Sequence, residues 1–415
     1  MARLPLPNHF YESLLPIFVL TTILGVFPMF PVKRMGEYTL YTSRKLHLIT
    51  SLLLTIFSLC FAMTIIRKSN TVVGKKFYKK RNKVSNFGIT FEFIFGIVIL
   101  YTLYFMSFVK TKHVKNVMMS LNKVDDLLKN MKQKFRYGRF VCYQLIIIFS
   151  GLMMVTLIAS MQIQNIRIEK FPPLSLHMWI LFIYPLVPLY DMNSQFGITA
   201  MLIYERFKMI NQQLENIKFK LDGYHVKTTV PIVRNAKKSA DPKILNNIIT
   251  LVKIHEILCR VAQKTNLNYN IQMLPTLAHQ FFVSLFSIFY YYWMYSSKPF
   301  SASCWLAWGF YKTYEILHVT ITCHLASEEA QVIGRKVHKI LIRNDNEEIE
   351  EKLLAFSKQV IHSKFKFTLC GLFNIDASLL FNMIGSSTTF IVIMIQFQET
   401  MSPTTCISNR TSFVI

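Results

Sequence analysis

The chain has 415 residues, of which 52% are hydrophobic and 17% are charged, and its mean hydropathy is +0.33. A soluble protein of this length carries roughly a quarter charged residues, so the composition excludes an ordinary soluble domain and indicates a protein embedded in a lipid bilayer. The formal net charge is +25. The basic residues lie in connections between apolar segments and do not line one helix face, which argues against nucleic acid as a partner.

Residues 1–45 are expected to form a cytosolic N-terminal region with one short interfacial or re-entrant helix. The apolar stretch from Leu14 to Phe30 contains Pro16 and Pro28, so it is too interrupted for a full membrane span. It also lacks the small-residue cleavage site of a secretory signal. We therefore expect no cleavable signal peptide.

Seven apolar segments of about 20 residues follow, each long enough to cross roughly 30 Å of hydrocarbon as a helix. Such segments are expected to be helices because a helix satisfies its own backbone polar groups. We place them near residues 46–66, 87–109, 140–163, 176–203, 272–295, 303–325 and 379–397. The sequence therefore predicts an all-α membrane protein with seven transmembrane helices.

Seven spans place the two ends of the chain on opposite sides of the bilayer, so the distribution of Lys and Arg predicts the orientation. With the N-terminus inside, 34 Lys and Arg residues lie on the cytosolic side and 12 on the outer side. This predicts an inverted topology with a cytosolic N-terminus and an extracellular tail at 398–415. The loop at 67–86 is an exception to this distribution, because its eight basic residues would face outward. A glycosylation sequon at Asn409 lies in the predicted outer tail.

Long polar connections at 110–139, 204–271 and 326–378 are predicted to be cytosolic. Residues 243–269 carry apolar side chains spaced for one helix face, which indicates a cytosolic extension of span five. Several glutamates follow Asp345 and favour the positive N-terminal end of a helix. We expect Asn344 or Asp345 to cap that helix.

The most specific pattern in the chain lies between Cys370 and Gln398. Thr389-Phe390 is followed by five hydrophobic residues and then by Gln396-Phe397. This resembles the C-terminal signature of insect gustatory receptors, in which Thr-Tyr, five hydrophobic residues and Gln-Phe occur in that order. Phe390 stands in the place of the usual tyrosine and lacks its hydroxyl. Further residues that resemble the family are Gly371, Phe373, Asp376, Ser378, Leu379, Leu380, His324, Leu325, Ala326 and Glu328.

The resemblance implies that the protein is similar to insect odorant receptors and assembles as a homo- or heterotetramer with other gustatory receptors. It implies that residues 46–325 form a six-helix bundle that binds a small-molecule tastant, and that 326–378 form cytosolic anchor helices. The pore helix at 379–397 would line one central pore. The expected function is that of a tastant-gated, non-selective cation channel in the plasma membrane of chemosensory neurons. The sequence does not distinguish sugar from bitter tastants.

Physical chemistry supports a pore at this segment. A single glutamine in a lipid-facing apolar helix would leave an unpaired amide in hydrocarbon, which is costly. Four copies of Gln396 around an axis would instead meet water, and their carbonyl oxygens would form a weakly selective cation pore. The alternative is that Gln396 bonds a neighbouring helix or reaches the membrane interface. The predicted pore and gate residues are Gln396, Phe397, Ile393 and Thr389.

Ionisable residues within membrane spans indicate functional sites by default. Glu92 lies in span two, Asp191 in span four, and Lys312 and Glu315 in span six. Lys312 and Glu315 are three residues apart, so a mutually neutralising pair explains them equally well. The resemblance implies that aromatic residues of spans four, five and six line a pocket, although an aromatic belt at the membrane interface also explains them. The predicted ligand-binding residues are Trp179, Tyr292, Trp308, Glu92 and Lys312.

Two other classes of protein remain as alternatives. A seven-helix receptor coupled to a G protein would have an outer N-terminus, an acidic-arginine-aromatic triplet after span three and an NPxxY-like end to span seven, and none of these is present. A small-molecule transporter is disfavoured because no internal repeat is visible. No nucleophile, acid–base pair or metal-ligand spacing supports an enzyme, and we expect no cofactor or metal.

Overall fold

The structure is a computed structural model, and it describes residues 9–34, 37–69, 83–168, 186–227, 241–343 and 346–401. Trp179, the sequon at Asn409 and most of the basic loop at 67–86 lie outside the described residues. In chain order the elements are α1 (Phe10–Ser13), α2 (Leu15–Leu24), β1 (Met29–Arg34), β2 (Glu37–Thr42), α3 (Arg44–Ser69), α5 (Lys83–Asn130), α6 (Tyr137–Ile168), α8 (Leu186–Lys227), α9 (Pro242–Met294), α10 (Pro299–Ile342), α11 (Glu347–His362), β3 (Thr368–Leu369), β4 (Phe373–Asn374) and α12 (Ala377–Met401).

Each of the seven predicted spans falls on one long helix among the described residues. These helices are α3, α5, α6, α8, α9, α10 and α12. In the described part of the chain, α5, α6, α9 and α12 contain windows long and apolar enough to cross a membrane by length and composition. In α10 the apolar sequence is interrupted by Lys312 and Glu315, and the first ten residues of the fourth predicted span precede the described start of α8.

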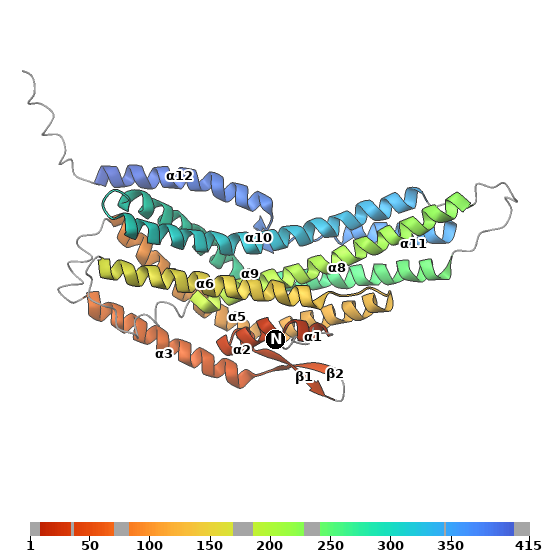
Figure 1. The fold of residues 1–415 in the computed structure, drawn as a ribbon, viewed down its shortest axis with the longest axis horizontal. Coiled ribbons are helices and arrows are strands. Elements are labelled where there is room, and N and C mark those ends of the chain that lie inside the picture. Colours follow the sequence, from red (N-terminus) through yellow and green to blue (C-terminus); the bar gives the residue numbers. More distant parts are fainter. Residues whose placement is uncertain are drawn as a thin grey trace, which may run out of the picture.

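Four of the long helices, α5, α8, α9 and α10, run well beyond the length of a membrane span. They form one elongated bundle (Figure 1). α9 is a single helix of 53 residues, although Pro275 lies inside it. Its first half buries Ile244, Ile248 and Leu251, which confirms the helical periodicity predicted for 243–269. α11 packs against α9 and α10 at one end of the bundle, and α12 lies along the other half.

α11 begins after Asn346, whose side-chain oxygen accepts hydrogen bonds from the backbone of Glu348 at 3.1 Å and Ile349 at 3.2 Å. The prediction that Asn344 or Asp345 caps this helix was therefore wrong by one or two residues. Three residues in a row, Asn344, Asp345 and Asn346, can all act as caps, and local composition does not distinguish them.

The N-terminal segment combines two short helices with a hairpin that the sequence did not predict. After α2 the chain turns at Gly25, which has a φ of 71°, a left-handed conformation that glycine adopts without strain. β1 and β2 then pair antiparallel, from Met29 opposite Thr42 to Arg34 opposite Glu37. The helices of the bundle hold this segment by polar contacts. Tyr104 donates to the carbonyl of Leu24 at 2.8 Å, the backbone of Phe27 donates to Ser107 at 2.6 Å, and Gln144 donates to the carbonyl of Ser13 at 2.6 Å.

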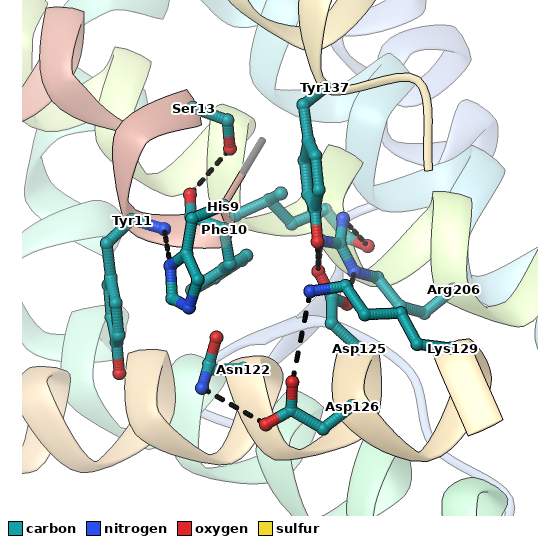
Figure 2. Close-up of polar contacts among 11 residues, drawn as sticks. His9, Phe10, Tyr11, Ser13, Asn122, Asp125, Asp126, Lys129, Tyr137 and Arg206 are labelled. Atoms are coloured by element: carbon teal, nitrogen blue, oxygen red, sulfur yellow. Dashed lines mark hydrogen bonds and ion pairs between the residues drawn. The ribbon is translucent and has the colours of Figure 1, made fainter. Parts of the chain in front are cut away.

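A buried ion pair joins three helices beneath α1 (Figure 2). Arg206 of α8 donates from Nε and Nη2 to the two carboxylate oxygens of Asp125 of α5, each at 2.9 Å, and Tyr137 of α6 donates its hydroxyl to Asp125 at 3.0 Å. Burial and the neighbouring Asp125 carboxylate raise the pKa of the Tyr137 phenol, so it remains a proton donor. The rings of Phe10 and Phe135 each lie 5.5 Å from the guanidinium carbon.

Candidate ligand site and pore helix

Three of the five predicted ligand-binding residues meet inside the bundle. The indole Nε1 of Trp308 on α10 donates a hydrogen bond to a carboxylate oxygen of Glu92 on α5 at 2.8 Å. Lys312 lies one turn after Trp308 on the same helix face, and its Nζ is 5.1 Å from the centre of the Trp308 ring system. Glu92 and Trp308 are separated by 216 residues, so the folding of the bundle is what places them together.

The same group contains a buried ion pair. Lys312 Nζ lies 3.3 Å from Glu315 Oε2, and the two side chains are 2% and 0% exposed. The side-chain amide of Gln280 on α9 donates to the same oxygen at 2.5 Å. This confirms that Lys312 and Glu315 neutralise each other, and the Gln280 amide supplies one of the additional hydrogen bonds that a buried pair requires. We call Glu92, Gln280, Trp308, Lys312 and Glu315 the bundle polar cluster.

Of the two remaining predicted ligand residues, Tyr292 is not part of this cluster. Tyr292 lies near the end of α9 with 58% of its surface exposed, and Trp179 lies outside the described residues. Gln280 was not among the residues predicted from the sequence, although a glutamine inside an apolar span is itself a signal. Neither was Tyr311, whose ring centre lies 4.7 Å from Lys312 Nζ. Among the described residues, no group of three or more His, Cys, Asp and Glu is placed to hold a metal ion.

α12 begins at a short turn built from the residues that resemble the family. β3 and β4 form a two-stranded hairpin whose turn contains Gly371 at a φ of 75°. Asp376 then caps the helix, because its side chain accepts hydrogen bonds from the backbone of Ser378 at 3.0 Å and from its hydroxyl at 2.5 Å. The Asp-x-Ser pattern therefore has a local role in starting α12.

One side of α12 faces the bundle and the opposite side faces away from it. On the bundle side, the Phe390 ring packs against Phe282 of α9 with ring centres 6.4 Å apart, and Gln398 is 4% exposed. The partly or fully buried residues on this side recur every three or four positions, as Leu380, Met383, Ser387, Met394 and Gln398. About half a turn away, a second row is exposed throughout and consists of Asn382, Ser386, Thr389, Ile393, Gln396 and Thr400. We call this row the polar stripe, and Phe397 lies exposed beside it.

Comparison with known proteins identifies the family that shares this architecture. A family described as 7tm chemosensory receptor matches residues 14–401. Gustatory receptors 28b and 28a of Drosophila melanogaster are each 22% identical to the chain, over 94% and 86% of its length and 86% and 85% of theirs. The structure of the insect olfactory receptor OR5 from Machilis hrabei matches with a TM-score of 0.66 at 11% identity, covering 93% of this chain and 98% of OR5. OR5 in complex with eugenol matches with a TM-score of 0.67 at 10% identity, covering 94% and 98%.

The fold and these likenesses define an all-α, multi-pass membrane receptor with the architecture of insect chemoreceptors, which is not an enzyme. The chain belongs to the 7tm chemosensory receptor family, with insect gustatory receptors as relatives along most of its length. The family and the helical fold predicted from the sequence are confirmed. The orientation in the membrane, the assembly and the site residues remain predictions.

Proposed function

We propose that the chain is a subunit of a tastant-gated, weakly selective cation channel in the plasma membrane of chemosensory neurons. The observation that carries the proposal is the polar stripe of α12, which faces away from its own bundle. Hydroxyl and amide groups in such a row would be costly against lipid. They become favourable where several copies of α12 surround a water-filled axis, because water then satisfies them.

Assembly is part of the proposal because a single α12 encloses nothing. We propose a homo- or heterotetramer in which four polar stripes meet at one axis, with Gln396 and Phe397 near the end of α12. The ligand is proposed to be a small molecule of the sugar or bitter type that binds at the bundle polar cluster. The chemosensory family supports this, as does the eugenol complex of OR5, since both concern receptors for small molecules.

A direct recording tests the channel. Cells that express the chain alone or with a partner gustatory receptor should show ligand-evoked current within milliseconds in excised patches, where soluble signalling components are absent. The alternative function is that of a receptor that signals through a G protein. It predicts a delayed response that disappears on excision or when the pipette contains a non-hydrolysable GDP analogue.

The proposed orientation has a separate test. The excess of Lys and Arg on the N-terminal side predicts a cytosolic N-terminus and an extracellular tail. An antibody against an epitope added after Ile415 should therefore stain intact cells, and an epitope added before Met1 should stain only permeabilised cells. The reverse pattern would contradict the orientation and favour the G-protein-coupled class.

Replacing Trp308 by alanine should shift the dose–response of an activating ligand by at least about tenfold, the scale of a lost buried aromatic contact. Trp308 is 4% exposed and bonded to Glu92, so the change removes both a ring surface and the partner of a carboxylate. Trp293 is 39% exposed on α9, and Trp293→Ala is the matched control. Equal responses of both variants and the wild type, at equal surface expression, would place the ligand elsewhere.

A further inference from the structure

The bundle polar cluster contains more carboxyl groups than ammonium groups. It has two carboxyl groups, on Glu92 and Glu315, and one ammonium group, on Lys312. Lys312 Nζ forms its ion pair with Glu315 Oε2, at 3.3 Å. Among the described residues, the side chain of Glu92 accepts a hydrogen bond from the neutral indole of Trp308 and forms no ion pair. A carboxylate inside a membrane-spanning helix is costly unless a cation compensates it.

The cluster also contains buried acceptor atoms that no hydrogen bond satisfies, beside a Tyr311 hydroxyl that is likewise unbonded among the described residues. Glu315 Oε1 and Gln280 Oε1 are both buried, and neither atom has a hydrogen-bond partner among the described residues. As whole residues, Glu315 and Gln280 are only 2% and 1% exposed. Unsatisfied acceptors at such depth cost free energy, and a ligand that brings N–H donors or positive charge would remove that cost. Glu92 is half-buried, whereas Glu315 is buried.

Aromatic rings lie beside the bundle polar cluster. Lys312 already shows that this surface accepts an ammonium ion, since its Nζ lies 5.1 Å from the centre of Trp308 and 4.7 Å from that of Tyr311. Trp305 of α10 and Tyr290 of α9 pack with ring centres 4.6 Å apart. One turn before Glu92, Gly88 lets Tyr290 approach α5, because a Cβ at that position would stand 2.2 Å from the Tyr290 hydroxyl.

We propose that the bundle polar cluster binds organic ammonium ions, with the positive group on Glu92 and the apolar part against the neighbouring aromatic rings. The proposal rests on the proposed function for the location of the ligand and adds its chemical class. A carboxylate flanked by aromatic faces is the combination that recognises alkylated amines, because the rings attract the cation without competing for the carboxylate. Neutral polyols offer no charge to compensate Glu92 and are expected to bind more weakly.

The test compares two probes of the same shape. Benzyltrimethylammonium carries a permanent positive charge, and neopentylbenzene replaces its nitrogen by carbon. Binding to the purified full chain in detergent is measured directly by the concentration dependence of thermal stabilisation, which needs no channel opening. We expect the ammonium probe to bind at least about tenfold more tightly than the carbon probe. Glu92→Gln should weaken the ammonium probe by at least about tenfold and leave the carbon probe unchanged.

Two control variants make the result specific to Glu92. Glu92→Asp keeps the charge and should retain more binding than Glu92→Gln. Glu256→Gln removes a carboxylate from the exposed part of α9, where Glu256 is 55% exposed and paired with Arg260, and should bind as the wild type does. A carboxyl group that is held protonated would produce equal binding of both probes and no effect of Glu92→Gln, and this outcome would overturn the inference.

The inference and the proposed function fail separately. If neutral molecules open the channel while the ammonium probe does not bind, the channel proposal stands and the ligand class is wrong. If the ammonium probe binds in a Glu92-dependent way but no variant of α12 alters conduction, the ligand class stands and the pore assignment is wrong.

Discussion

Replacing Phe397 by serine should produce current in the absence of ligand. A ring of aromatic side chains next to the polar stripe excludes water, and a small polar residue there removes the barrier without moving any charge. Only a modest barrier is expected, because a ligand that binds the open state roughly a hundredfold more tightly contributes about 2.7 kcal/mol. The side chain is 51% exposed, so the substitution leaves the packing of the subunit intact.

The neighbouring Gln396 should control permeation instead of gating. Gln396→Glu places one carboxylate per subunit on the proposed axis, so block by divalent cations and preference for cations over anions should both increase. Gln396→Met keeps the size, removes the amide and adds no charge, and it should lower conductance without adding divalent block. The measurement is the reversal potential and the block by extracellular calcium, for each variant.

A second phenylalanine serves as the control for the gate. Phe381 is 73% exposed on α12 but lies off the polar stripe. Phe381→Ser should leave basal current at the wild-type level. If Phe397→Ser and Gln396→Glu reach the surface and alter neither basal current nor ion selectivity, α12 is not the pore and the channel proposal loses its main support.

Replacing Arg206 by alanine should cause the largest loss of stability of any single change discussed. The side chain of Asp125 is 0% exposed and that of Arg206 4% exposed, so Arg206→Ala leaves a buried carboxylate with one neutral donor. Breaking a buried pair in this way costs about 3–5 kcal/mol. We expect a large fall in the thermal unfolding temperature in detergent and poor delivery to the cell surface. Arg206→Lys should recover part of the loss, because lysine keeps the charge but not the paired geometry.

Two further variants separate the charge from the packing. Tyr137→Phe removes one hydrogen bond to Asp125 and should cost about 1 kcal/mol. Arg260→Ala breaks an ion pair whose side chains are 59% and 55% exposed, and an exposed pair contributes only about 0–1 kcal/mol. If Arg206→Ala unfolds within about 1 kcal/mol of Arg260→Ala, the buried pair is not what holds α5, α6 and α8 together.

The sequence by itself determined the features that depend on neighbouring residues and on the solvent. Apolar segments of sufficient length must be helices in a bilayer, so each predicted span falls on one of the long helices among the described residues. An ion pair between Lys312 and Glu315 was one of two interpretations that the sequence allowed, because residues three apart share a helix face. The pattern from Thr389 to Phe397 indicated the family without any knowledge of the fold.

Only the tertiary structure decided which faces of the helices meet. Glu92 contacts Trp308 across 216 residues, and Asp125 contacts Arg206 across 81. Such contacts depend on the rotation and vertical position of each helix in the bundle, and apolar spans that are hydrophobic on every side carry little information about either. The same reason explains why Tyr292, aromatic and at a suitable depth, lies apart from the cluster. It also explains the polar stripe, which became visible once the face of α12 that packs on α9 was known.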